Sequence, residues 1–133
     1  MPIMRTLYKV KIMTTPLTKT QYTSWQKYLI KALRKISIND PIRKDVFNRA
    51  RVGKNQYLCA TCDKTFPRHE CNDDHIDPVI CPKEGWQDQE IFFARLFCAI
   101  ENRQLLCKSC HNEKTKKERA IRYEYRKKRQ AEQ

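Results

Sequence analysis

Glycine is scarce in this sequence, at two positions among 133 residues. That excludes a collagen-like or low-complexity chain, and 40% hydrophobic with 32% charged residues is typical of a globular, helix-rich protein. The sequence also lacks the run of about 18 apolar residues that a membrane-spanning helix needs. Its first ten residues, MPIMRTLYKV, lack the apolar core of a signal peptide. We therefore expect an intracellular, cytoplasmic protein with no membrane partner.

Acidic residues are few: 15 Asp and Glu stand against 28 Lys and Arg, which gives a formal net charge of +13. Such an excess in a small protein favours a polyanionic partner, with nucleic acid as the first candidate. Many small proteins are basic for solubility alone, so charge by itself leaves both interpretations open. The length is close to that of one domain, and we expect a single core with helical additions.

Two helices are predicted before the first cysteine. Between residues 18 and 37 apolar side chains recur at helical spacing, and Thr18 with Gln21 fits a capping box. Asp40 and Pro41 are suited to be the N-cap and first residue of a second helix. The buried face of that second helix is predicted to hold Ile42, Val46, Phe47 and Ala50.

Three further local features complete the secondary-structure prediction. Gly53 is expected to end the second helix. Residues 87 to 100 are strongly apolar and predict a helix that packs over the core. The chain after His111 is very basic and predicts a helix that runs to Gln133 with only a weak apolar stripe.

The cysteines point to a metal rather than to disulfides, because their number, seven, is odd and no export signal is present. Four of them form two CxxC pairs, Cys59 with Cys62 and Cys107 with Cys110. Two intervening residues let one tight turn present both sulfurs to a tetrahedral ion, so the pairs predict a closed structural zinc site. A redox CxxC would need only one pair. No function is assigned to the remaining three, Cys71, Cys81 and Cys98.

The most unusual residues lie between and beside the two cysteine pairs, in CNDDHIDPV and ENRQLLCKSCHNEKTKKE. These strings resemble the motif of the HNH (ββα-metal, or His-Me finger) endonuclease family. In that motif an Asp-His or His-His pair precedes Ile-x-Pro, and an Asn precedes Leu-Cys-x-x-Cys-His and Lys-Thr. The matching residues are Asp74, His75, Ile76, Pro78, Asn102, Leu106, Cys107, Cys110, His111, Lys114 and Thr115.

The resemblance covers roughly residues 57 to 118 and implies an α+β fold. A small ββα-metal core with zinc knuckles would follow two basic amphipathic helices and precede a basic C-terminal helix. The ribbon would lie around residues 72 to 79 and 102 to 107, with its helix beginning near Cys110. The implied division is 1-56 as the helical N-terminal region, 57-118 as the nuclease core and 119-133 as the tail.

The resemblance further implies a metal-dependent endonuclease, of phage or mobile-element type, that hydrolyses DNA phosphodiester bonds. His75 would be the general base, because a neutral imidazole can accept a proton from water near neutral pH. Asp74 and His111 would hold a catalytic Mg²⁺ or Mn²⁺ with positions left open for water and phosphate. Asn102 would orient the loop that carries Asp74 and His75. Monomer and homodimer both stay open.

Basic residues around the motif are expected to hold DNA phosphates. Those nearest to it are Arg68, Lys83, Arg103, Lys108, Lys114, Lys116, Lys117 and Arg119. Others that would extend the footprint are Arg43, Arg49, Arg51 and Lys54. His69 has no motif partner, and we assign it no function.

Two other functions stay open. A non-catalytic, zinc-stabilised module that binds DNA or RNA would explain the charge and the cysteine pairs, but not the set of Asp74, His75 and His111. A decayed nuclease kept as an interaction subunit would fold and bind DNA without cutting it. Metal-dependent nicking of DNA separates both from an active nuclease.

Overall fold

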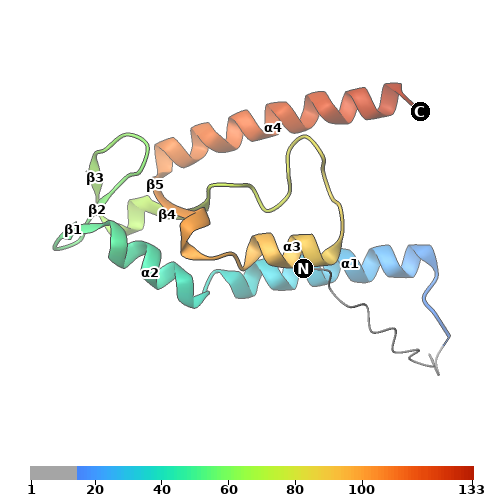
Figure 1. Ribbon diagram of the computed structural model, residues 1–133, viewed down its shortest axis with the longest axis horizontal. Helices are drawn as coiled ribbons and strands as arrows, with labels where there is room; N and C mark the ends of the chain where they lie inside the picture. The colour runs from blue at the N-terminus through green and yellow to red at the C-terminus, as the bar shows by residue number, and fades with distance from the viewer. Residues whose placement is uncertain (1–14) are drawn as a thin grey trace, which may run out of the picture. The chain divides into compact units, whose positions relative to one another are not determined.

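The computed structural model describes residues 15 to 133. The chain divides into two compact units, one ending at Leu33 and one formed by Arg34–Gln133, and each is described by itself. The described residues form a small α+β fold with four α-helices and two small antiparallel sheets (Figure 1). No helix in this part of the chain has both the length and the apolar character that a membrane crossing requires.

The first predicted helix is confirmed as α1, Lys19–Ser37. Its capping box forms in both directions: the Thr18 backbone N–H donates to Gln21 Oε1 at 3.0 Å, and the Gln21 N–H donates to Thr18 Oγ1 at 3.2 Å. Two N–H groups that the helix cannot satisfy internally are thereby bonded, which explains why the helix begins here.

The second predicted helix is α2, Pro41–Ala50, and Asp40 caps it by accepting from the backbone N–H two residues on at 2.8 Å. The prediction that Gly53 ends this helix is wrong. Arg51 already has extended dihedrals, φ −70° and ψ 126°, and Gly53 lies in a strand, β1, Arg51–Gly53. Pairing with the next strand therefore ends α2 before a glycine is needed.

A three-stranded sheet that the sequence analysis did not predict follows α2. β1 pairs with β2, Gln56–Leu58, and β2 pairs with β3, Thr65–Phe66, all antiparallel. The β1–β2 turn uses Asn55 at φ +52°, a left-handed conformation that asparagine tolerates. Cys59 follows β2 directly, so this sheet carries the first cysteine pair.

The second sheet is a ribbon of β4, Cys71–His75, and β5, Arg103–Cys107. Its antiparallel register joins Cys71 to Cys107 at one end and His75 to Arg103 at the other. Both predicted strands form, although the first ends at His75 and not near Val79. The second cysteine pair begins at the last residue of β5.

The segment between β4 and β5 contains a shorter helix than predicted. α3 spans Gln89–Leu96 instead of residues 87 to 100. Asp88 Oδ1 caps it by accepting from the Ile91 N–H at 2.8 Å, and Phe97 leaves helical dihedrals at φ −101°, ψ 47°. A 3₁₀ turn, Ile100–Asn102, then leads into β5.

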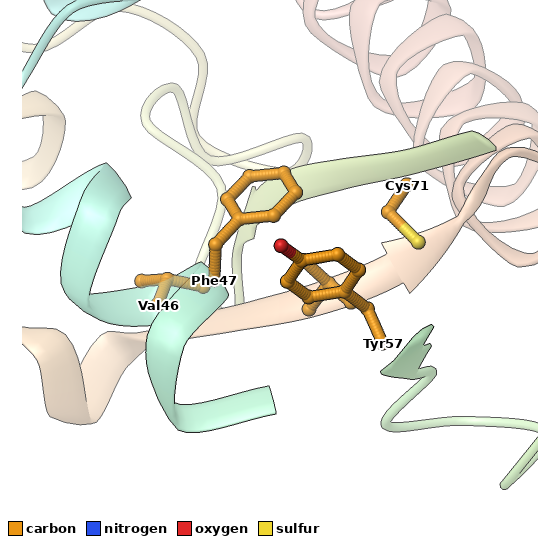
Figure 2. Close-up of a cluster of buried hydrophobic side chains, with 5 residues drawn as sticks. Val46, Phe47, Tyr57 and Cys71 are labelled. Atoms are coloured by element: carbon orange, nitrogen blue, oxygen red, sulfur yellow. The ribbon is translucent and has the colours of Figure 1, made fainter. Parts of the chain in front are cut away.

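The last helix, α4, Lys108–Ala131, starts directly after β5 and holds the predicted basic C-terminal helix. α2 and α4 lie on opposite sides of the ribbon (Figure 1), because successive strand residues point to opposite faces. The side toward α2 is the main core, and it confirms the predicted buried face of that helix. Figure 2 shows this core, whose buried members are Val46, Phe47, Tyr57, Cys71 and Leu105.

Candidate functional site

The four cysteines of the CxxC pairs meet at one end of the ribbon. The sulfurs of Cys59, Cys62, Cys107 and Cys110 all lie within 4.8 Å of one another. Four thiolates around one zinc ion at Zn–S distances of ~2.3 Å would be ~3.8 Å apart, so the cluster is consistent with a structural zinc. The 44 residues between the pairs are accommodated because β4, α3 and the 3₁₀ turn form a loop that returns to β5.

Backbone groups prepare these sulfurs to be thiolates. The Cys107 N–H donates to Cys59 Sγ and the Cys110 N–H donates to Cys107 Sγ, each at 3.4 Å. Burial raises the pKa of Cys59, but hydrogen bonds from the backbone of Cys62, Cys107 and Thr61 outweigh it and lower that pKa to about 6.

The pKa of Cys110, the fourth cysteine of the cluster, is instead raised by its surroundings. The neighbouring Cys107 sulfur, and then burial, raise the pKa of Cys110 to about 12. Four such sulfurs cannot all be ionised side by side without a cation between them. The cluster therefore has the donor set and the spacing for a metal, and it needs one to carry four thiolates.

At the other end of the ribbon, the residues of the Asp-His pair and the helix histidine come together. Asp74 on β4 is 8% exposed, and His111 on α4 has its Nε2 atom 3.8 Å from Asp74 Oδ1. The other carboxylate oxygen, Oδ2, accepts from Gln104 Nε2 at 2.9 Å and from Lys114 Nζ at 2.8 Å. Oδ1 is thus the oxygen that faces His111 while Oδ2 is fixed.

Lys114 is held in this position from several sides. Its Nζ also donates to the backbone carbonyl of His75 and lies 3.1 Å from Glu118 Oε1, one turn along α4. Lysine was matched to the motif in the sequence and expected to bind phosphate. In the structure its ammonium instead joins the two carboxylates of Asp74 and Glu118.

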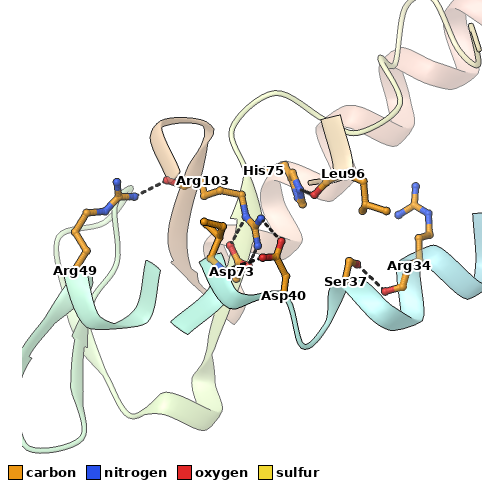
Figure 3. A network of polar contacts seen from close by, with 9 residues as sticks. Arg34, Ser37, Asp40, Arg49, Asp73, His75, Leu96 and Arg103 are labelled. Carbon is orange, nitrogen blue, oxygen red and sulfur yellow. Dashed lines mark hydrogen bonds and ion pairs between the residues drawn. The ribbon is translucent and has the colours of Figure 1, made fainter. Parts of the chain in front are cut away.

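His75, at the end of β4, has its ring fixed by the chain's own backbone (Figure 3). The distance from His75 Nε2 to the carbonyl oxygen of Leu96, at the end of α3, is 2.9 Å. A carbonyl can only accept, so Nε2 carries the hydrogen, and Nδ1 keeps a lone pair in the neutral ring. The short helix α3 therefore sets the tautomer of this histidine.

Asn102 fastens the loop that follows β4. Its side-chain Oδ1 accepts from the Asp77 N–H at 3.0 Å, and its backbone carbonyl accepts from the Ile76 N–H at 2.9 Å. The loop is therefore tied to the start of β5 through two bonds from one residue.

Asp74, His75 and His111 line a common hollow of about 310 Å³, which we call the cleft. Arginines from two helices also line it, among them Arg119 and Arg122 on α4. Burial, and then the charge of Arg122, lower the pKa of Arg34, which lines the same cleft. The lining of the cleft therefore holds more Lys and Arg side chains than carboxylates: Arg34, Lys114, Arg119 and Arg122 against Asp73, Asp74 and Glu118.

The prediction for Arg103 is wrong. It was expected to hold phosphate, but its side chain is only 2% exposed and its guanidinium binds Asp40 and Asp73 (Figure 3). Arg103 NH1 donates to Asp40 Oδ2 at 2.9 Å, and Nε donates to Asp73 Oδ1 at 3.0 Å. These carboxylates raise its pKa further although burial opposes that, so Arg103 is a structural cation that joins α2 to the ribbon.

Arg49, expected to extend a DNA footprint, is also used inside the protein. Its NH2 group donates to the backbone carbonyl of Arg103 at 2.6 Å, and NH1 donates to that of Ile100 at 3.4 Å.

Three residues around the site were not predicted: Leu96, Gln104 and Glu118. Only Glu118 had a sequence signal, because it lies four residues after Lys114, the spacing of neighbours on one helix face.

Comparison with known proteins adds no relative: no protein-family model, no curated protein and no solved structure matches the chain.

Proposed function

We propose that the protein is a metal-dependent endonuclease that hydrolyses DNA phosphodiester bonds, with a ββα core formed by β4, β5 and the start of α4. The observation that supports this most is the pair of Asp74 Oδ1 and His111 Nε2, 3.8 Å apart, in the cleft that His75 also lines. A carboxylate, two imidazoles and surrounding arginines are the groups that phosphodiester hydrolysis uses.

The donor types of this pair suit a catalytic divalent ion. Two adjacent ligands of one Mg²⁺ at ~2.1 Å lie ~3.0 Å apart, so the two atoms, 3.8 Å apart in the structure, would have to move closer together to share an ion. Asp74 Oδ1 and His111 Nε2 would hold Mg²⁺ or Mn²⁺ and leave its other positions for water and phosphate oxygens. When bound, the ion would neutralise charge on the phosphate and lower the pKa of a bound water.

Asp74 is prepared for this role by its neighbours. Because Gln104 and Lys114 both donate to Oδ2, the carboxylate cannot rotate freely, and Oδ1 stays directed toward His111. Lys114 and Gln104 are positioning residues in this proposal. Glu118 offsets part of the Lys114 charge, which would otherwise repel a divalent cation.

His75 would accept the proton of the attacking water at Nδ1. The bond from Nε2 to the Leu96 carbonyl keeps the hydrogen on the far nitrogen and stabilises the imidazolium that forms after proton transfer. Asn102 would keep the loop after His75 in place. The residues of the cleft thus divide into a proton acceptor, a metal pair and their supports.

Zinc has a separate role in this proposal. The four cysteines leave no ligand position open, so zinc at that cluster would stabilise the fold and take no part in hydrolysis. It would hold the start of α4, and therefore His111, against the ribbon.

Cleavage of supercoiled plasmid DNA by zinc-loaded protein tests the proposal. Wild-type protein should nick or linearise the plasmid with Mg²⁺ or Mn²⁺ and stop when exchangeable divalent ions are chelated. His111→Ala should lose activity at low metal and regain part of it as Mn²⁺ is raised, because one ligand of two remains. Asn112→Ala is the matched control, since that side chain is exposed on the same helix and does not line the cleft, and it should cut like the wild type.

Two outcomes would replace the proposal. DNA binding with no cleavage at any metal concentration would favour the zinc-stabilised DNA- or RNA-binding module, or a decayed nuclease. Cleavage that persists after chelation would contradict the metal pair itself.

A further inference from the structure

A second hollow, of about 520 Å³, is formed by α2, the β1–β2 turn, the 3₁₀ turn before β4 and the start of β4, and it has no role in the proposed reaction. Its lining residues are Arg43, Asn55, Arg68, His69, Cys71 and Asn72. We name it the arginine hollow. All of its members lie in the unit of residues 34 to 133.

Two arginines are brought together here by one aromatic ring. The guanidinium carbon of Arg68 is 4.5 Å from the ring centroid of Phe47, and that of Arg43 is 5.3 Å from the same centroid. Phe47 is only 1% exposed, so the ring is a fixed part of the core. Two cations held at one ring repel each other, and a stacked ring compensates only part of that cost.

Neither arginine forms an ion pair with a carboxylate of the described residues. The ion pairs formed by residues 15 to 133 leave Arg43 and Arg68 without an acidic partner within 4.0 Å. This contrasts with Arg103, which has two carboxylates. Two guanidinium groups stacked on one ring without an ion-pair partner are an arrangement that an anion would complete.

Backbone elements, and not flexible side chains alone, give the arginine hollow its shape. Arg68 begins a 3₁₀ turn, Arg68–Glu70, and its backbone N–H donates to Asn55 Oδ1 at 3.0 Å. That bond ties the loop of Arg68 to the β1–β2 turn, while α2 carries Arg43. Asn72, on β4, adds an amide that can donate to an oxygen.

We propose that the arginine hollow binds a backbone phosphate of a nucleic acid strand that also passes through the cleft. Asn72 and Asp74 lie two residues apart on β4, a separation of ~7 Å along the strand, comparable with that of neighbouring phosphates. The arginines are the only groups of the hollow with permanent positive charge, and guanidinium groups match phosphate oxygens in a bidentate manner. The inference rests on the proposed binding of DNA, but not on its cleavage.

The test is fluorescence anisotropy with a labelled 20-base-pair duplex of mixed sequence, without added divalent ion, over a series of NaCl concentrations. The double variant Arg43→Gln, Arg68→Gln should reduce the slope of log Kobs against log[NaCl] by about one, because the contact with one phosphate is lost. The matched control is Lys44→Gln, Lys64→Gln. It removes the same charge from exposed neighbours outside the hollow, and it should change the slope by much less.

A second variant guards against a folding defect, since both arginines contact Phe47. Asn72→Asp is nearly isosteric and puts a carboxylate into the hollow, so it should weaken DNA binding at every salt concentration while the melting temperature stays near that of the wild type. The proposal is overturned if the arginine pair and the lysine pair change the slope equally, or if Asn72→Asp binds like the wild type.

Plasmid cleavage separates this result from the proposed function. A reduced slope in a protein that never cuts would support the phosphate site and contradict the nuclease. If the wild type cuts normally with metal and the arginine double variant has an unchanged salt slope, the nuclease is supported and the phosphate site is contradicted.

Discussion

The two ends of the β4–β5 ribbon differ in how their polar atoms are satisfied. At the Cys71–Cys107 end, the four sulfurs lie close together, those of Cys59 and Cys107 accept backbone N–H groups, and Cys59 is fully buried. At the His75–Arg103 end, Asp74 and His111 border a cleft, and their facing atoms are 3.8 Å apart without a bond between them. The first end is closed and suited to a structural ion, and the second has room for substrate.

The same contrast occurs within two consecutive residues of β4. The carboxylate of Asp73 binds buried Arg103, whereas that of Asp74 binds Lys114 on α4 and faces His111, although both residues line the cleft. Because adjacent strand residues face opposite sides, the strand can place a structural carboxylate beside one available for chemistry. Stability and activity should therefore respond to different mutations, even where these are neighbours.

The largest expected effect is at the closed end. Cys59→Ser or Cys110→Ser should abolish zinc binding and leave the protein unfolded, because a structural zinc contributes about 10–16 kcal/mol, comparable with the whole stability of a domain. Elemental analysis and circular dichroism measure both losses. Cys98→Ser is the control and should stay folded, since that thiol lies outside the cluster. Folded, active protein without zinc would contradict this role.

The second-largest effect is expected at the neighbouring carboxylates, Asp73 and Asp74, which should respond differently to substitution. Asp73→Asn should lower the free energy of unfolding by about 3 kcal/mol, because it removes one of the two charges that compensate buried Arg103. Asp74→Asn should cost less than this, because Lys114 keeps Glu118 as an ion-pair partner, but it should weaken Mn²⁺ binding and cleavage. Urea denaturation and metal titration measure the two quantities. Equal destabilisation by both substitutions would remove the distinction between the two faces.

The smallest effect concerns α3, which holds the Leu96 carbonyl against His75. Asp88→Ala removes the N-cap and should destabilise the protein by about 1 kcal/mol. Hydrogen exchange should show this loss first in residues 89 to 96. Exchange that increases equally throughout the unit of residues 34 to 133 would mean that α3 has no separate stability.

Local patterns in the sequence predicted much of this fold. The capping box at Thr18, the cap at Asp40 and the two cysteine pairs depend on residues a few positions apart, and each has the contacts that its spacing predicts. The mistaken positions depend on partners distant in the chain. The strand at Gly53 exists because β2 and β3 pair beside it, and Arg103 is buried because Asp40, 63 residues earlier, reaches it.

In the candidate site, too, residue types were predictable from the sequence whereas distant partners were not. Asp74, His75, Asn102 and His111 were singled out by residue type, and the structure brings Asp74, His75 and His111 to one cleft. Their supports could not be inferred, because the partner of His75 is a backbone carbonyl, which any residue could supply. The roles proposed for these residues stay predictions.

The most direct test of the account is the rate of DNA cleavage by His75→Ala with saturating Mg²⁺, measured on protein shown to contain zinc and to bind DNA as the wild type does. The substitution removes the proposed proton acceptor but leaves the metal pair and the cysteine cluster. We predict a rate about 10²–10⁴-fold below that of the wild type, with no recovery when metal is raised. A variant that cuts at the wild-type rate would contradict the account.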